Sequence, residues 1–392
     1  MSQNIIKLFI IAGEASGDVL GGKLLQNIKN EIKSNPDFNN KNLEISGIGS
    51  TNLEKQGLKS IFDMSELSLM GFFEIIPHIP KLIKRINQTT QEIIDFQPDI
   101  LVTIDSPDFC FRVIKKLRKH KISDNIKKIH FVAPTVWAYR PKRAEKIAKL
   151  FDLLLVILPF EPPYFEKYGL KTKYIGHPIT ENYTIVKNDN FKDKYKINNN
   201  KQIICLTPGS RIGEIKRVFP QMIKAMQIIE KKHKNFTICI PIIKKTEDVI
   251  KKIASQYKFN AILVEQEDKI KLFHNSDLAL AKSGTNTLEM SLYKIPMIIA
   301  YKANSLTYFI LKRLVKVKFA NIINLILNKE LIPEMLQNNC QADKIAQKLE
   351  ELINNKEKQE EQIEQSQEIL EILGLNAKES PSKKAAMQCL DF

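Results

Sequence analysis

The chain has 392 residues, which is too long for one ordinary hydrophobic core and fits two domains of common size. Hydrophobic residues at 43% and charged residues at 27% are typical of a soluble globular protein. A net charge of +16 favours polyanions such as nucleic acid, anionic lipid headgroups or phosphorylated substrates. Part of that charge follows from a general richness in lysine, and no nucleic-acid-binding motif is present, so we expect no nucleic-acid partner.

Cysteine and histidine usage argues against disulfide and metal chemistry. The five cysteines are scattered without a C-x-x-C pair, and the six histidines show no H-E-x-x-H spacing. We therefore expect a reducing cytosol, no metal and no cofactor. No apolar run reaches the ~20 residues that a membrane span needs, so any membrane contact is expected to be peripheral.

Short apolar runs alternate with amphipathic helical patterns along the chain, which predicts parallel sheets built from βαβ units. The predicted strands lie at residues 5–11, 45–48, 100–104, 129–132 and 153–158, and then at 203–206, 237–240, 261–264, 278–281 and 297–300. Helices are predicted at residues 19–31, 82–95 and 215–231.

The predicted fold is α/β, with two Rossmann-like doubly wound domains facing a central cleft at the carboxyl ends of both sheets. The first domain is placed at residues 1–180 and the second at 201–353, with a polar linker at 181–200 rich in Asn and Lys. Residues 354–392 are predicted to form a helical tail, in which residues 380–384 are expected to be loosely held.

The first strand leads into the loop AGEASGD (residues 12–18), which matches neither the dinucleotide-binding fingerprint nor the P-loop. Its acids Glu14 and Asp18 would repel a phosphate and suit sugar hydroxyls or an amide. Asp18 is equally well explained as a residue that caps or charges a helix N-terminus.

Two further loops of the first half carry candidate chemistry. Asp105 ends the strand at residues 100–104, where its carboxylate could accept a proton from a sugar hydroxyl. Two residues separate it from Asp108, so the pair is not a D-x-D metal motif, and helix capping fits Asp108 better. Farther on, the only tryptophan, Trp137, is followed by Arg140 and two more cations, which favours sugar stacking and phosphate binding over a core-filling role.

Two loops of the second half have the composition of anion-binding turns before helices. Gly209, Ser210 and Arg211 follow one predicted strand, and Arg can form two hydrogen bonds to a diphosphate. The second loop supplies backbone N–H groups, hydroxyls and an acid that could reach ribose, from Gly284, Thr285, Asn286, Thr287 and Glu289. Ordinary helix capping explains either loop alone; the two together favour a diphosphate site without metal.

These residues resemble the lipid-A-disaccharide synthase family. The matching segments run in family order over nearly the whole chain: IAGEASGD (residues 11–18), MGFFE (70–74), IDSPDF (104–109), APTVWAYRPKRAEKI (133–147), LPFEPPYF (158–165), GHP (176–178), PGSR (208–211), SGTNTLE (283–289) and IPEMLQ (332–337). Tyr139 and Ser50 depart from the family pattern, which tends to have Trp and Gly at these positions.

The resemblance implies an inverting glycosyltransferase of the GT-B type. Its donor would be UDP-2,3-diacylglucosamine and its acceptor 2,3-diacylglucosamine 1-phosphate, giving the β-1,6-linked tetraacyl disaccharide 1-phosphate and UDP. Asp105 would then be the base, with His177 as the alternative. Arg211, Ser210 and the loop at residues 284–287 would stabilise the departing UDP.

The resemblance also implies places for the remaining candidates. Glu289 would hold the ribose, and Asn324 and Gln337 would lie near the donor. Glu14, Asp18, Trp137 and Arg140 would lie on the acceptor side.

Because both substrates reside in a membrane leaflet, the resemblance implies a cytoplasmic enzyme that is peripheral on the bacterial inner membrane. Apolar residues followed by cations within residues 62–86 suit interfacial insertion, with Leu69, Phe72 and Phe73 as the candidate anchor. A core helix with a basic outer face is the alternative. A homo-oligomer is left open.

Three competing functions are kept. Two are enzymes of the same fold class, a peptidoglycan N-acetylglucosaminyltransferase and a UDP-sugar 2-epimerase. The third is a non-catalytic binder of acylated sugars, which we would expect to lack Asp105 or Arg211, and both are present.

Overall fold

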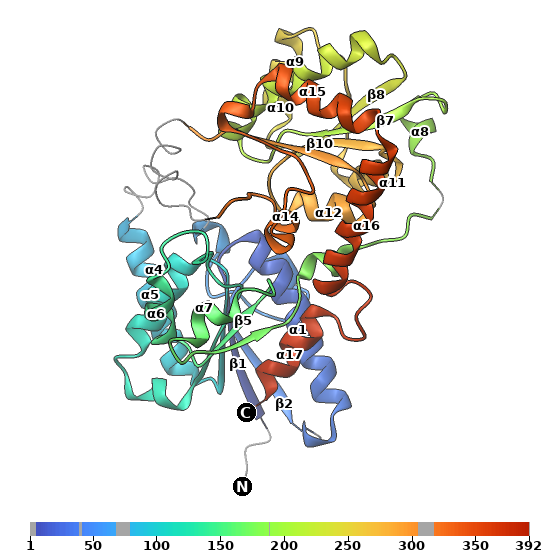
Figure 1. The fold of residues 1–392 in the computed structure, drawn as a ribbon. Coiled ribbons are helices and arrows are strands. Elements are labelled where there is room, and N and C mark those ends of the chain that lie inside the picture. The colour runs from blue at the N-terminus through green and yellow to red at the C-terminus, as the bar shows by residue number, and fades with distance from the viewer. Residues whose placement is uncertain (1–4, 39–40, 68–78, 188, 305–316, 392) are drawn as a thin grey trace. The chain divides into compact units, whose positions relative to one another are not determined.

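The computed structural model describes residues 5–38, 41–67, 79–187, 189–304 and 317–391. The chain divides into two compact units (Figure 1). Unit 1 comprises Met1–Pro178 together with Asn376–Phe392, and unit 2 comprises Ile179–Leu375. In the described residues each unit contains one parallel sheet of six strands.

Three strands of the unit 1 sheet, at residues 5–12, 100–104 and 153–156, are rich in Ile, Leu and Val and are largely buried on both faces. Its strands, in spatial order, are β2 (Asn42–Ile48), β1 (Ile5–Ala12), β3 (Ile100–Ile104), β4 (Lys127–Phe131), β5 (Leu153–Val156) and β6 (Lys171–Tyr174). Its α-helices are α1 (Ala15–Ser34), α2 (Thr51–Glu54), α4 (Ile79–Phe96), α5 (Pro107–Leu117), α6 (Arg143–Ala148), α7 (Pro162–Glu166) and α17 (Pro381–Leu390).

Unit 2 repeats this architecture. Its strands, in spatial order, are β12 (Glu334–Leu336), β11 (Met297–Tyr301), β10 (Leu278–Lys282), β7 (Gln202–Thr207), β8 (Phe236–Pro241) and β9 (Ile262–Val264). Its α-helices are α8 (Phe191–Lys194), α9 (Ile212–Lys232), α10 (Glu247–Gln256), α11 (Lys269–Asn275), α12 (Asn286–Leu292), α14 (Ile322–Leu327), α15 (Ala342–Ile353) and α16 (Lys356–Ile372).

The strand order places a switch point in each sheet, where the chain changes its direction of travel across the sheet. The switch lies between β1 and β3 in unit 1 and between β7 and β10 in unit 2. Loops after the two strands at such a point diverge and leave room for a ligand at the carboxyl edge. The loops singled out in the sequence follow β1, β3 and the neighbouring β4 in unit 1, and β7 and β10 in unit 2.

The ten predicted strands are present, and two more, β6 and β12, lie at sheet edges. The sequence KTKY of β6 alternates in burial, and β12 has only three residues, so neither has the continuous apolar run of a central strand. None of the helices in the described part of the chain is long and apolar enough to cross a lipid bilayer.

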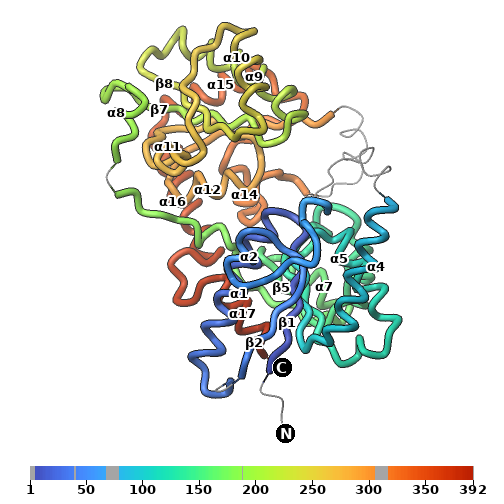
Figure 2. Tube along the Cα trace, turned by 180° about the vertical axis from the view of Figure 1, so that it is seen from behind, coloured from blue at the N-terminus to red at the C-terminus, as the bar shows by residue number. Residues whose placement is uncertain are grey.

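The tail is helical as predicted, with α16 and α17, whereas the linker and the end of the tail differ from the prediction. Within residues 181–200, Phe191 is buried in unit 2 and Lys194 forms an ion pair with Asp268 at 2.5 Å. Residues 380–384, expected to be loosely held, instead begin α17. Ser380 caps this helix by accepting a hydrogen bond from the Lys383 N–H, and its Ala385, Ala386 and Cys389 are fully buried. Figure 2 shows α17 beside α1, and the two helices are in contact.

Candidate functional site

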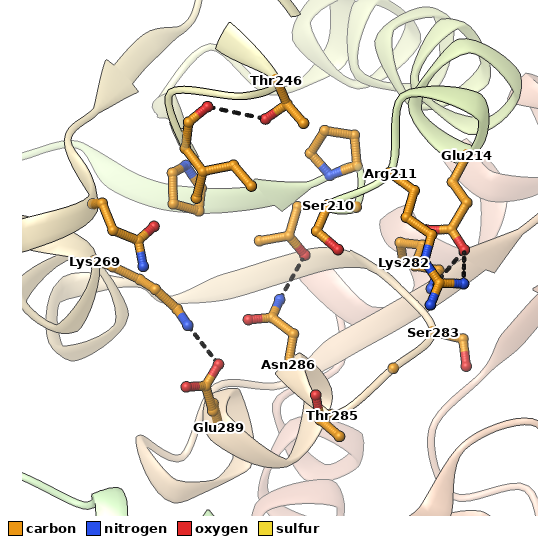
Figure 3. A pocket seen from close by; sticks show the side chains of 17 residues that line it. Ser210, Arg211, Glu214, Thr246, Lys269, Lys282, Ser283, Thr285, Asn286 and Glu289 are labelled. Carbon is orange, nitrogen blue, oxygen red and sulfur yellow. Dashed lines mark hydrogen bonds and ion pairs between the residues drawn. The ribbon is translucent and has the colours of Figure 1, made fainter. Parts of the chain in front are cut away.

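A pocket of about 430 Å³ lies at the switch point of unit 2, within that unit alone. It is formed by the loops that follow β7 and β10, with further residues from the segments after β8 and β9. In the described residues its lining contains three cationic side chains and two carboxylates: Arg211, Lys269, Lys282, Glu214 and Glu289. Their placement divides the pocket into two ends (Figure 3).

One end gathers Arg211, Glu214 and Lys282 (Figure 3). Gly209 has φ +115°, a left-handed conformation that glycine adopts without strain, and it turns the chain from β7 toward α9. Arg211 occupies the N-cap of α9, and its side chain is 66% exposed. Two cations beside a glycine turn at the start of a long helix are typical of sites that bind phosphate groups.

The other end is organised by Glu289 and Lys269. Their side chains form an ion pair at 2.6 Å, so the carboxylate of Glu289 has a cationic partner in the ligand-free chain. Between the two ends, Asn286 donates from Nδ2 to the hydroxyl of Thr207 at 3.1 Å, which links the loop after β10 to the end of β7. A carboxylate and an amide in this part of the pocket suit hydroxyl groups of a sugar.

Seven of the ten predicted donor-site residues line this one pocket: Gly209, Ser210, Arg211, Gly284, Thr285, Asn286 and Glu289. The other three correct the prediction, because they lie outside the lining. Thr287 is buried, donates to the Gly284 carbonyl and accepts from Asn321. Asn324 is also buried, and Gln337 accepts a hydrogen bond from the backbone N–H of Ala303.

Asn324 belongs to the framework beneath the loops. Its amide nitrogen donates to the Ile332 carbonyl and to Glu334, and its amide oxygen accepts from the N–H groups of Leu331 and Ile332. All of its hydrogen-bonding capacity is therefore used within the protein. Sequence reasoning also missed Lys269, Gln266 and Thr246, which follow no motif, and Lys282, which directly precedes a recognised loop.

The switch point of unit 1 presents Asp105 in a strained backbone conformation. Asp105 and Ser106 have φ values of +51° and +43°, a region that residues with side chains seldom adopt. The turn packs tightly against the loop after β1, since a Cβ on Gly13 would lie 2.4 Å from the Ser106 hydroxyl oxygen. Strain of this kind persists where the surrounding structure fixes it, and it is concentrated at functional sites.

The ionisation of Asp105 fits a proton acceptor. Burial raises the pKa of its carboxyl group, and the backbone N–H of Ser106 partly offsets this. A carboxylate with a raised pKa is a stronger base than an exposed one. His177 is also buried, and burial lowers its pKa to about 4, which makes its imidazole a weaker base than that of an exposed histidine.

Asp18 has a structural partner for each of its carboxylate oxygens. They accept hydrogen bonds from the backbone N–H groups of Ser50, Asn52 and Leu53 and from the Asn52 amide, so Asp18 caps α2. This corrects its expected place on the acceptor side. Glu14 occupies the N-cap of α1 and remains half-buried at the carboxyl end of β1.

Trp137 and Arg140 follow β4, which is the neighbour of β3 in the sheet. Arg140 is exposed and lies over the ring of Tyr139 at 4.6 Å. Trp137 is partly buried, packs edge-on against Phe160 and donates from its indole nitrogen to Glu161 at 3.1 Å. The other carboxylate oxygen of Glu161 accepts from the Leu158 N–H at 3.0 Å, so this buried residue fixes the indole to the loop after β5.

We expect the fluorescence of Trp137, the only tryptophan, to titrate near pH 7. Burial raises the pKa of Glu161 to about 7, so the acceptor of the indole N–H changes charge there. The raised value means that the folded state favours the protonated acid. Glu161 therefore contributes about 3 kcal/mol to the free energy of unfolding at low pH. This contribution is complete below the pKa that Glu161 has in the unfolded chain, and it is lost as the pH rises through about 7. Glu161→Gln should abolish the transition, whereas Glu166→Gln, at an exposed position in α7, should retain it; a transition in the first variant would assign it to another group.

Two further expectations concern a metal site and the membrane-binding residues. In the described ranges, no group of three or more His, Cys, Asp or Glu side chains is placed to hold a metal ion. The candidate membrane residues Leu69, Phe72 and Phe73 lie outside the described residues.

Two doubly wound units with parallel sheets have the GT-B fold, and this confirms the predicted α/β fold class. A glycosyltransferase from Rickettsia africae has a similar fold, with a TM-score of 0.58 at 16% identity over 99% of both chains. A UDP-GlcNAc 2-epimerase from Neisseria meningitidis, solved with UDP-GlcNAc bound, has a TM-score of 0.60 at 14% identity over 94% of this chain and 99% of its own. At these identities the likeness establishes the fold alone.

The sequence relatives define the family. The family model described as lipid-A-disaccharide synthetase matches residues 8–388. A lipid-A-disaccharide synthase from Rickettsia prowazekii is 44% identical over 382 residues, which cover 97% of each chain. The chain belongs to the lipid-A-disaccharide synthase family, glycosyltransferases of lipid A biosynthesis, and the resemblance drawn from the motifs is confirmed.

Proposed function

We propose that the chain transfers the sugar of UDP-2,3-diacylglucosamine, with inversion, to the 6-hydroxyl of 2,3-diacylglucosamine 1-phosphate. The products are the β-1,6-linked tetraacyl disaccharide 1-phosphate and UDP. The observation that carries this proposal is the pocket of unit 2, which combines Arg211 and a glycine turn at one end with Glu289 at the other. Cations at one end and a carboxylate at the other fit the diphosphate and the ribose of a nucleotide sugar.

On the donor side, the diphosphate lies at the Arg211 end and the ribose at the Glu289 end. Glu289 then exchanges its ion pair with Lys269 for hydrogen bonds from the ribose hydroxyls. Arg211 acts chiefly as the bond to the sugar breaks, because negative charge then accumulates on the departing UDP.

On the acceptor side, Asp105 takes the proton of the 6-hydroxyl while the acceptor oxygen forms its bond to the anomeric carbon of the donor. The bond from that carbon to the diphosphate oxygen breaks at the same time, and its electron pair leaves with UDP. Attack from the side opposite to the leaving group inverts the anomeric centre. Arg140 is assigned to the 1-phosphate of the acceptor, and Trp137 and Glu14 to its sugar.

The test is product analysis after both substrates are mixed with the purified chain in a buffer containing EDTA. We expect mass spectrometry to show the tetraacyl disaccharide 1-phosphate together with UDP, and NMR to show a β anomeric linkage. Turnover should survive the chelator, because protein cations occupy the phosphate end of the pocket. Activity lost with EDTA and restored by Mg²⁺ would contradict this part of the mechanism. An isomerised UDP-sugar would support the epimerase alternative, and binding without release of UDP the non-catalytic one.

We also propose that the chain is cytoplasmic and binds the inner membrane surface through the first turns of α4. Ile79 and Ile83 are 41% and 50% exposed there, with Lys81 and Lys84 on the same exposed stretch, whereas Ile86 and Ile93 later in the helix are buried. Exposed apolar side chains among lysines suit insertion at an anionic interface.

Replacing both Ile79 and Ile83 with Ser should weaken vesicle binding by at least about tenfold, because each buried isoleucine contributes roughly 1.5–3 kcal/mol. The measurement is co-sedimentation with phosphatidylethanolamine–phosphatidylglycerol vesicles at high salt, which screens attraction that is purely ionic. Ile372→Ser, equally 50% exposed but on α16, is the matched control. Equal binding by the double variant and the control would place the anchor elsewhere.

A further inference from the structure

Lys282 stands where the two phosphate-binding turns of unit 2 approach each other. It is the last residue of β10, and its side chain is only 20% exposed. A Cβ on Gly209 would lie 3.6 Å from the Lys282 Cδ and Cγ atoms, and a Cβ on Gly284 would lie 3.8 Å from its Nζ. The side chain therefore runs past one glycine turn, and the ammonium group lies beside the other.

The position of this ammonium group is set by Glu214 and Tyr301. Its Nζ lies 3.2 Å from Glu214 Oε1 and 5.3 Å from the centre of the Tyr301 ring. Arg211 meets the same carboxylate more loosely, at 3.9 Å. Glu214 thus brings both cations to one end of the pocket (Figure 3).

Glu214 itself is buried, with 6% of its surface exposed, and its Oε2 atom has no hydrogen-bond partner in the described structure. Two cations therefore share a single carboxylate, and one charge at this end is left without compensation. A bound group with negative charge would neutralise it. A diphosphate is such a group, and a neutral sugar is not.

We infer that Lys282 is a second cation for the donor diphosphate, beside Arg211, and that Glu214 is the residue that positions it. This inference rests on the proposed function, since it assumes a UDP-sugar in this pocket. Lys282 supplies a largely buried charge in a fixed position. Arg211 supplies an exposed side chain that can move with the phosphates as UDP leaves.

The test compares UDP with uridine, which carries no phosphate, by isothermal titration calorimetry. Lys282→Met keeps the length of the side chain and removes its charge. We expect this variant to bind UDP about tenfold or more weakly, because a hydrogen bond between two charged groups is stronger than one between neutral groups. Uridine binding should be unchanged. Lys282→Arg should retain most of the UDP affinity. Lys252→Met, at an exposed position of α10 outside the pocket, makes the same change in net charge and should have no effect.

Lys282→Met leaves Glu214 buried without its closer cation, which can impair folding. A double variant and a chemical-protection experiment therefore complete the test. The double variant Lys282→Met, Glu214→Gln removes both charges and should show the same selective loss of UDP affinity. In the wild-type chain, UDP should protect Lys282 but not Lys252 from an amine-acylating reagent, as mapped by peptide mass spectrometry.

UDP affinity that is unchanged in both Lys282 variants would overturn the inference. So would an equal loss of UDP and uridine, since that would show a role in the shape of the pocket alone. A wild-type chain that binds neither ligand would instead overturn the proposed function.

Discussion

Asp105→Asn should lower turnover by about 10²–10⁴-fold, because the amide keeps the size of the carboxylate but cannot take a proton from the acceptor hydroxyl. The affinity for UDP should stay near that of the wild type, since Asp105 belongs to unit 1 and the pocket proposed for UDP lies within unit 2. Steady-state rates at saturating substrate, together with calorimetry of UDP binding, separate the two effects. The acid limb of the wild-type pH–rate profile should lie above the ordinary range of an aspartate, because burial raises the pKa of Asp105.

The comparison variant for Asp105 is His177→Gln, with circular dichroism of both proteins as the check on folding. His177 is buried and its pKa is lowered to about 4, so we expect a role in packing and a much smaller loss of turnover. Near-normal turnover in Asp105→Asn beside collapse in a folded His177→Gln would reverse the assignment of the base.

Arg211→Ala should lower kcat by about 10²–10³-fold, the usual loss when one group that stabilises developing charge is removed. Its side chain is 66% exposed, and the buried Glu214 keeps its closer partner Lys282, so the substitution should cost little stability. We expect KM for the donor to rise less than kcat falls, because the interaction strengthens as the UDP charge develops.

Two further substitutions serve as controls for Arg211→Ala. Arg211→Lys should recover part of kcat, because it restores the charge but not the paired geometry of the guanidinium group. Lys216→Ala, at an exposed position on the same helix, should match the wild type. An Arg211→Ala enzyme with normal kcat and raised KM would show that Arg211 only binds the donor.

The central strands and most loops of the site could be predicted from sequence because their signals are local. Buried runs such as residues 100–104 are continuous and apolar, and the turns that follow them are rich in glycine and charge. The edge strand β6 could not be predicted in this way, because its residues alternate between buried and exposed.

The remaining site residues depend on long-range packing. Lys269 enters the pocket from α11, far along the chain from Arg211, and no spacing rule connects the two. Asn324 was assigned to the donor site by resemblance, and only its hydrogen bonds in the folded chain show that it supports β12. Asp18 illustrates the same limit, since an acid in a loop is typical of both a ligand contact and a helix cap.

The position of α17 has a consequence for the order in which the chain can fold during synthesis. This helix closes the surface of unit 1 against α1, and Lys127 of β4 donates to the carbonyls of Gln388 and Cys389 at its end. All of unit 2 is translated before α17 emerges from the ribosome. Unit 1 is therefore the first unit to be translated and the last to be completed. The surface that α17 covers must stay exposed to solvent without aggregating until residues 381–390 have been made.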